Sequence, residues 1–156
     1  MSSHPAPFVG VVSDTHGELP RSALAAFAGA VHIIHAGDAE DESGMCALRQ
    51  LAPVCEVRGN MDRSGRAARR SKTALVEILG VAIYAIHDLL SLDIDPVAAG
   101  VQVVIHGHTH IAESVKRGQV LYLNPGSPSR PRRGGPSVAR LYLTPPDSWA
   151  EIVWLG

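Results

Sequence analysis

Short apolar runs that end at a glycine or a polar residue recur along the whole of this 156-residue chain. In the first 60 residues three such runs, 8–13, 31–36 and 53–58, alternate with two segments of helical character, 20–29 and 43–52. Runs of four to eight apolar residues bounded by turn residues are typical of buried strands. Alternation of strands and helices is typical of an α/β protein. We therefore predict a β-α-β-α-β order for this part of the chain, with Ser43 capping the second helix.

The second half of the chain is rich in strand-like runs and poor in helical ones. These runs cover 73–79, 81–87, 101–106, 112–116, 120–123, 138–144 and 149–155. Gly80 and Gly118 each separate a pair of runs, which predicts hairpins. No repeat or linker divides the chain, so we expect one domain over 1–156. The expected architecture is an α/β fold in which two mixed β-sheets pack as a sandwich with flanking helices, and the order of the strands does not follow from the sequence.

Composition and charge exclude several classes of protein. Apolar residues make up 46% of the chain, charged residues 19%, and the formal net charge is −1. These values exclude a disordered tail and a globally basic nucleic-acid binder. No apolar run approaches the roughly 18 residues of a membrane span, and no Lys or Arg precedes the first apolar stretch as in a secretory signal. Cys46 and Cys55 lack metal-type spacing, so we interpret them as ordinary buried thiols of a cytoplasmic protein.

Polar residues that bind metals follow five of the predicted strands. They are Asp14 with His16, Asp38, Asn60 with Asp62, His87, and His108 with His110. The carboxyl ends of strands in an α/β sheet meet at one edge, where ligands bind. Residues two apart in an extended segment point to the same side, as Asp14 and His16 would. Each motif alone is a weak signal, but the ordered set favours a metal site over separate packed histidines. His4, His32, His35 and His106 are interpreted as packed or solvated residues.

The order of these motifs resembles a known family. D-x-H, then G-D, G-N, a lone histidine and G-H-x-H resembles the signature of the calcineurin-like metallophosphoesterases, over residues from Phe8 to about Leu143. It is most similar to their small single-domain phosphodiesterase branch, to which the retromer scaffold subunit is related. The stretch from Asn124 to Ser127, followed by Arg130 and Arg132, is similar to a further motif of that branch. The resemblance implies a metallophosphoesterase-like α/β/β/α sandwich.

The resemblance also implies roles for single residues. Asp14, His16 and His110 would hold one metal ion, Asn60, His87 and His108 a second, and Asp38 would bridge the two. Imidazole, carboxylate and amide ligands without thiolate suit Mn, Fe, Ni or Zn, and histidine-rich ligation disfavours Ca and Mg. We favour two manganese ions.

A charge count indicates the reaction. Asp14 and Asp38 neutralise two of the four charges of a divalent pair, and a bridging hydroxide leaves about +1, which matches a singly charged phosphodiester. The expected function is a metal-dependent phosphodiesterase whose dinuclear site activates a bridging hydroxide for in-line attack on phosphorus. Asp38, Asn60 and Asp62 are the predicted catalytic residues.

Two positions depart from the family pattern. Met61 stands where many relatives have the histidine that would serve as general acid, so we expect a preference for diesters with good leaving groups. Asp62 is the nearest candidate to supply the proton or to position water. Asp88 stands where relatives often have glycine, and it is expected either to orient His87 or to cap the following helix.

Alternative functions follow from the fold and from the basic residues. Nine of the 14 Lys and Arg residues lie in two clusters: Arg58, Arg63, Arg66, Arg69, Arg70 and Lys72, and Arg130, Arg132 and Arg133. They form either a wall that attracts a nucleotide or short nucleic acid, or a solvated mobile loop. Aromatic residues, at 4%, offer little surface for base stacking. A nuclease or cyclic-nucleotide hydrolase using the same site, and a non-catalytic protein-interaction scaffold, are the alternatives; the intact ligand set favours an enzyme.

Overall fold

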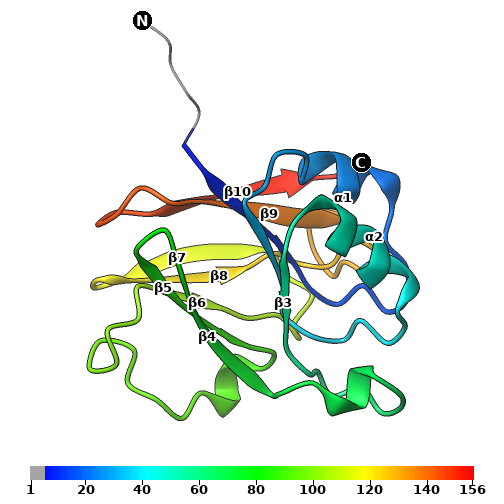
Figure 1. Cartoon of the computed structure of the whole chain (residues 1–156), viewed down its shortest axis with the longest axis horizontal. Coiled ribbons are helices and arrows are strands. Elements are labelled where there is room, and N and C mark those ends of the chain that lie inside the picture. Colours follow the sequence, from blue (N-terminus) through cyan, green and yellow to red (C-terminus); the bar gives the residue numbers. More distant parts are fainter. Residues whose placement is uncertain (1–5) are drawn as a thin grey trace, which may run out of the picture.

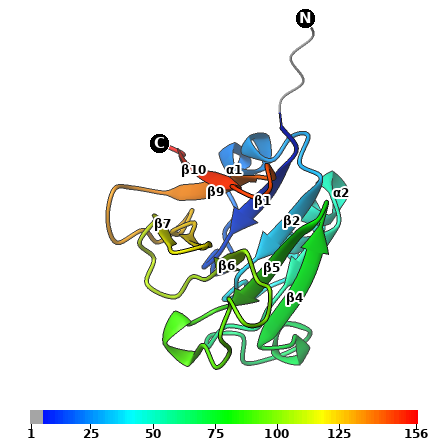
Figure 2. The same cartoon turned by 90° about the vertical axis from the view of Figure 1, so that its left-hand side faces the viewer.

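The computed structural model describes residues 6–156 and shows two five-stranded sheets packed face to face (Figures 1 and 2). The first sheet has the order β10-β9-β1-β2-β3 and consists of β1 (Phe8–Val12), β2 (His32–His35), β3 (Val54–Glu56), β9 (Ser137–Tyr142) and β10 (Trp149–Trp154). The second has the order β4-β5-β6-β8-β7 and consists of β4 (Thr73–Ile78), β5 (Val81–Ile86), β6 (Val103–Ile105), β7 (Glu113–Arg117) and β8 (Val120–Asn124). His4 lies outside the described residues.

Both sheets are mixed, as expected. In the first sheet β1, β2 and β3 run parallel, and β9 is antiparallel to both β1 and β10. In the second, β5, β6 and β8 run parallel, while β4 and β7 are antiparallel edge strands. Every predicted strand is present, with ends that differ from the prediction by at most two residues. The predicted α/β sandwich is therefore confirmed.

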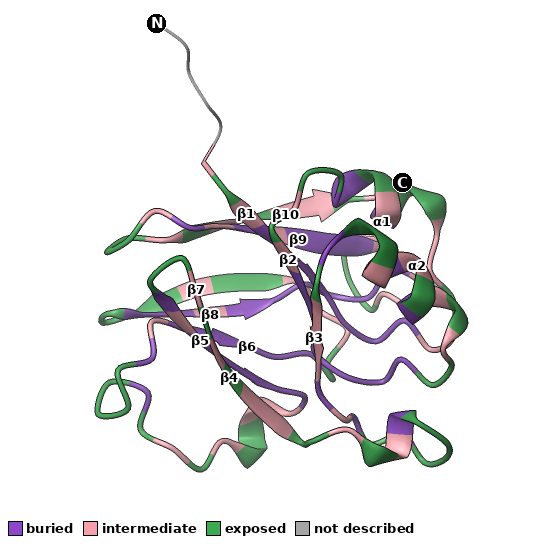
Figure 3. Cartoon of the chain, in the orientation of Figure 1, coloured by how far each residue is buried: buried purple, intermediate pink, exposed green. Residues whose placement is uncertain are grey.

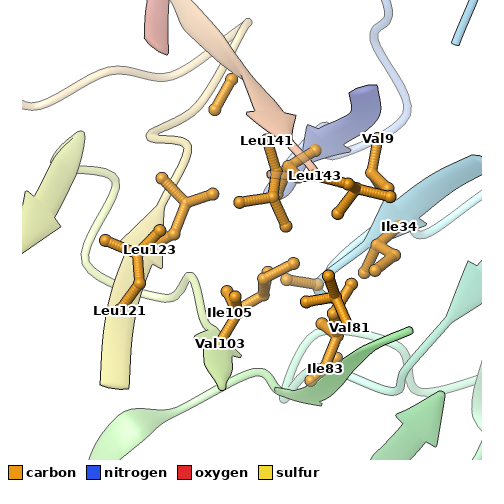
Figure 4. Packing of buried hydrophobic residues seen from close by; sticks show 14 of the residues in the cluster. Val9, Ile34, Val81, Ile83, Val103, Ile105, Leu121, Leu123, Leu141 and Leu143 are labelled. Carbon is orange, nitrogen blue, oxygen red and sulfur yellow. The ribbon is translucent and has the colours of Figure 1, made fainter. Parts of the chain in front are cut away.

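The main hydrophobic core lies between the two sheets (Figure 4). Val9 and Ile34 from the first sheet meet Ile83, Ile105 and Leu123 from the second. The neighbouring side chains point the other way, and on the first sheet they are covered by helices. Strands that are buried on both faces appear in the sequence as unbroken apolar runs. These strands could therefore be predicted from the sequence. Burial across the fold is shown in Figure 3.

Two helices, α1 (Arg21–Ala26) and α2 (Ser43–Leu51), cover the outer face of the first sheet. Phe27 and Leu48 pack there against Ile33. The outer face of the second sheet is covered instead by the loop around the short 3-10 helix Leu89–Ser91. A second such turn spans Ala67–Arg69. None of the helices within residues 6–156 is long and apolar enough to cross a membrane.

Two local predictions were wrong. Ser43 is the first residue of α2 and does not cap it; the Asp41 carboxylate accepts hydrogen bonds from the Ser43 backbone N–H (3.1 Å) and hydroxyl (2.8 Å). Neither cysteine is buried as expected, because Cys46 is exposed and Cys55 is half-buried. Both are free thiols.

Candidate metal centre

The loops that follow β1, β2 and β6 have an unusual backbone. Seven non-glycine residues within 6–156 have positive φ, and five of them are predicted metal ligands: Asp14 (56°), His16 (48°), Asp38 (60°), His108 (73°) and His110 (61°). Left-handed backbone is uncommon for residues with a Cβ, and it clusters at functional sites where the surrounding structure enforces it. Here it lets three loops turn sharply at the strand ends, so that side chains from both sheets meet.

Glycines next to the ligands allow the loops to approach closely. A Cβ on Gly59 would overlap Asp38 Oδ1, and a Cβ on Gly107 would overlap the Ser13 hydroxyl and lie 2.6 Å from Asp14 Oδ2. The loops are joined there by backbone hydrogen bonds, such as that from the Gly107 N–H to the His87 carbonyl (2.9 Å). The glycines of the G-N and G-H motifs are thus required by the ligands that they touch.

Asp14, His16 and His110 form the first donor group. Asp14 Oδ1 lies 3.2 Å from His110 Nε2 and 3.8 Å from His16 Nε2, and the two ring nitrogens are 3.3 Å apart. The side chain of Asp14 is fully buried, and that of His16 is 5% exposed. The structure therefore brings together the three residues predicted to hold one metal ion.

Asp14, Asp38 and His87 form a second donor group beside the first. His87 Nε2 lies 3.1 Å from Asp38 Oδ2 and 3.7 Å from Asp14 Oδ1. Asp14 thus belongs to both groups, whereas the sequence predicted Asp38 as the shared residue. Burial raises the pKa of the Asp38 carboxyl, but the hydrogen bond and charge of His87, the N–H of Met61 and the charge of His16 lower it overall. Asp38 is consequently influenced by histidines of both groups.

Asn60 and His108 lie beside the second group and towards solvent. Asn60 Oδ1 is 3.1 Å from His87 Nε2 and 3.2 Å from His108 Nδ1. The His108 side chain is 43% exposed, and the backbone N–H of His108 donates to Asp14 Oδ2 (3.0 Å). All seven predicted ligand residues therefore lie at one edge of the sandwich, although Asn60 and His108 lie outside the two compact donor groups.

Three of the histidines are held in the tautomer that a metal ligand needs. Nδ1 donates to the Ala36 carbonyl in His87 (2.7 Å), to the Arg130 carbonyl in His110 (2.6 Å) and to the Glu40 carboxylate in His16 (2.6 Å). Because each acceptor binds the Nδ1–H group, the proton of the neutral ring is on Nδ1. The lone pair on Nε2 therefore faces the centre. Metal-bound histidines generally donate their other nitrogen in this way.

The surroundings of Asp14 Oδ1 indicate whether the site fits a metal ion. This oxygen is buried and makes no hydrogen bond, although three Nε2 atoms surround it. Burial lowers the pKa of His87, but the hydrogen bond to Asp38 and the charges of Asp14 and Asp38 raise it overall. The cluster thus favours a positive charge at its centre. A buried carboxylate oxygen without a partner, ringed by ring nitrogens, fits divalent cations of the Mn, Fe, Ni or Zn type.

Two further carboxylates lie near the predicted ligands, and only Asp62 does not fit its predicted role. Asp62 is 1% exposed, and its oxygens accept three backbone N–H bonds, from Asp38 (3.0 Å), Glu40 (2.9 Å) and Gly59 (2.8 Å). The prediction that it donates a proton or positions water does not fit this geometry, because both oxygens are turned into the loops that they join. Asp88 caps the following 3-10 helix by accepting from the Leu90 N–H (3.0 Å), which is the second of its two expected roles.

Glu40 contacts a predicted metal ligand, and the sequence analysis did not single it out. It lies two residues after Asp38, in an acidic stretch that reads as a solvated loop, and its left-handed backbone (φ 65°) turns the side chain back onto His16. Its place two residues after the G-D motif is the signal that could have drawn attention to it.

Two mixed sheets with histidines and carboxylates gathered at one edge define an α/β sandwich protein with a candidate metal site. The chain matches the calcineurin-like phosphoesterase superfamily domain over residues 8–145 and therefore belongs to that superfamily. A probable metallophosphoesterase of Methanothermobacter thermautotrophicus is 36% identical over 159 residues, covering 95% of this chain and 92% of that protein. The family and this relative together support a phosphoesterase of the hydrolase class with a divalent-metal site.

Solved structures show the same fold at lower identity. One described as a novel archaeal phosphodiesterase has a TM-score of 0.73 at 23% identity, covering 94% of this chain and 99% of that one. Vps29 of Entamoeba histolytica complexed with zinc has a TM-score of 0.69 at 22% identity, covering 96% and 99%. At this identity the two structures support the fold assignment alone.

Proposed function

We propose that this protein is a dinuclear metal-dependent phosphodiesterase. The observation that carries the proposal is the pair of donor groups that share Asp14, because two such groups side by side suit two neighbouring cations. Asp14, His16 and His110 would hold one ion, and His87, Asn60 and His108 the other. We propose Asp38 as the bridging ligand, since His87 and His16 both act on its carboxylate.

The bound ions, with manganese favoured, would supply the Lewis acidity that activates water and stabilises charge on the phosphoryl oxygens. The protein's own residues hold that centre in place. The Ala36 and Arg130 carbonyls and Glu40 fix three imidazole rings. Two carboxylates leave the centre with net positive charge, which suits a singly charged diester better than a neutral substrate.

The departing alcohol needs a proton, and neither Met61 nor Asp62 is suited to supply it. Met61 cannot donate a proton, and its N–H is bound to Asp38 Oδ1 (2.8 Å). Asp62 is engaged by the backbone. We therefore expect activity to rise steeply as the leaving group becomes more acidic, because an absent general acid typically costs about 10²–10⁴ in rate.

The test compares bis(p-nitrophenyl) phosphate with p-nitrophenyl phosphate, using metal-stripped protein before and after Mn²⁺ is restored. We expect hydrolysis of the diester that depends on Mn²⁺, and a much slower reaction with the monoester. Asp38→Asn should lower kcat/KM at least about 100-fold, because loss of a mere outer partner of a metal ligand already costs 10–100-fold. Asp41→Asn, an exposed acid three residues away, is the matched control. Activity on the monoester alone, or full activity without a divalent ion, would contradict the proposal.

A non-catalytic scaffold is the second candidate. It is supported by the exposed apolar residues Leu75 (61%) and Leu79 (62%) at edge strand β4 and the turn after it. Such residues are typical of contact surfaces when they gather in patches. The same assay, repeated with Fe²⁺, Ni²⁺ and Zn²⁺ in place of Mn²⁺, separates the candidates, since a scaffold would hydrolyse neither ester with any of these ions.

A further inference from the structure

A cleft of about 510 Å³ opens beside the second donor group. Asn60, His87 and His108 form its metal-facing side. Its volume falls in the range of small-molecule sites and exceeds what a phosphoryl group alone would fill. A substituent of the substrate therefore has room next to the metal centre on this side.

Two cations line one wall of the cleft. Arg58 follows β3 and Lys72 precedes β4, and the hydrogen bond from the Arg58 N–H to the Ser71 carbonyl (2.8 Å) holds the two segments together. Neither side chain has an ion-pair partner within residues 6–156. Arg70, from the same basic cluster, is instead paired with Glu42 and Glu56. The cluster thus divides into a structural arginine and two cations that are available to a ligand.

The rest of the cleft is lined mainly by polar side chains. Asp88, Ser91 and Asp93 stand there as hydrogen-bond acceptors, which suits hydroxyl groups. Among the described lining residues there is no Phe, Tyr or Trp. Single-stranded nucleic acids are usually held by stacking on aromatic rings. Recognition here rests on charge and hydrogen bonds, which favours a small molecule over a nucleic acid.

We infer that the substrate is a small phosphodiester with a second phosphate group on a hydroxyl-bearing substituent, and that Arg58 and Lys72 bind this second phosphate. The inference rests on the proposed phosphodiesterase function. A phosphate in the cleft would lie between two unpaired cations, and hydrogen bonds between charged groups are the stronger ones. Arg58 and Lys72 would then determine specificity without taking part in the chemical step.

The experiment uses two chromogenic diesters that differ by one group: uridine 5′-(p-nitrophenyl phosphate) and the same compound with a phosphate on O3′, which keeps its O2′ hydroxyl. With Mn²⁺-loaded protein we expect kcat/KM about tenfold higher for the compound with the second phosphate. In the double variant Arg58→Gln/Lys72→Gln this ratio should fall to near one, and in Lys72→Gln, which changes only an exposed side chain, it should fall part of the way. Arg21→Gln, an exposed arginine outside the cleft, should keep the wild-type ratio.

The outcomes separate this inference from the function on which it rests. Hydrolysis of neither compound by the wild-type protein would overturn the phosphodiesterase itself. Hydrolysis of both at equal rates, or a preference that survives the double substitution, would overturn only the inference about the second phosphate. Faster cleavage of a uridine oligonucleotide than of either compound would contradict the choice of a small molecule.

Discussion

At the scale of single residues, the metal centre depends on a short chain of contacts that starts at Asp62. This buried carboxylate accepts a hydrogen bond from the backbone N–H of Glu40 (2.9 Å). The Glu40 carboxylate in turn accepts one from Nδ1 of His16 (2.6 Å). A carboxylate in this position orients the ring and strengthens the metal-binding nitrogen. Glu40 is therefore a positioning residue for His16.

Replacing Glu40 should weaken metal binding before it affects anything else. We expect Glu40→Ala to lower the affinity for Mn²⁺ by about 10–100-fold, the usual cost of losing such a partner. Isothermal titration calorimetry of the metal-stripped protein measures this directly. Glu18→Ala removes the same charge from an exposed position of a neighbouring loop and should bind Mn²⁺ as the wild type does. Equal affinities in the two variants would show that Glu40 does not orient His16.

The predicted ligands and Glu40 differ in what the sequence reveals about them. Asp14, Asp38 and His108 follow apolar runs that end at glycine or polar residues, so strand ends and residue types were enough to bring them together. The role of Glu40 depends on a left-handed φ of 65°, and that of Asp62 on three backbone N–H groups from two loops. Neither backbone geometry nor loop packing has a local sequence signal.

At the scale of elements, a group of alternating charges ties α2 to β3 and to the loop before β4. Arg49 contacts Glu42 (2.9 Å) and Glu56 (2.7 Å), and Arg70 contacts both of the same carboxylates, with 2.6 Å between Nε and Glu56. Only 5% of the Arg70 side chain is exposed. Arg70 therefore anchors the loop that carries the cleft residues.

Removing this buried cation should destabilise the fold. Arg70→Met leaves two carboxylates with less compensation, and breaking a buried ion pair costs about 3 kcal/mol or more. Arg69→Met changes the exposed neighbour and should alter the free energy of unfolding by no more than about 0.5 kcal/mol. Urea unfolding of both variants measures the difference. A matching loss in both would mean that the ion pairs contribute little.

The positions of the strands along the chain could be predicted from the sequence, whereas their order in the sheets could not. Strand β5 has no charged residue because Ile83 packs between the sheets while Tyr84 packs on the outer face. The order β10-β9-β1-β2-β3 places β9 beside the first strand of the chain, with β10 beyond it. That pairing joins residues more than 120 apart, such as Phe8 and Tyr142, and no local pattern specifies it.

At the scale of the whole molecule, His35 links the core of the first sheet to the loop that carries Asp14 and His16. The Gly37 N–H donates to Nδ1 (3.1 Å), so the proton sits on Nε2, which donates to the Thr15 hydroxyl (3.0 Å). Burial, together with the positive charge of Arg70, lowers the pKa of His35 to about 3. The folded protein thus holds this imidazole neutral where an unfolded chain would protonate it.

The stability of the fold should therefore fall on mild acidification. Below pH 6.5 the unfolded state binds a proton at His35 that the folded state does not bind, so the free energy of unfolding decreases as pH falls. The loss approaches about 1.4 kcal/mol per pH unit and continues down to the folded pKa of about 3. Between pH 6.5 and 5.0 we expect His35 alone to contribute about 1.5 kcal/mol, measured as the difference in urea unfolding between the wild type and His35→Asn. NMR of the wild type gives an independent readout, because the His35 ring should keep its Nε2–H tautomer at pH 5. Titration of that ring near pH 6, or parallel pH profiles for the two proteins, would show that His35 does not couple stability to pH.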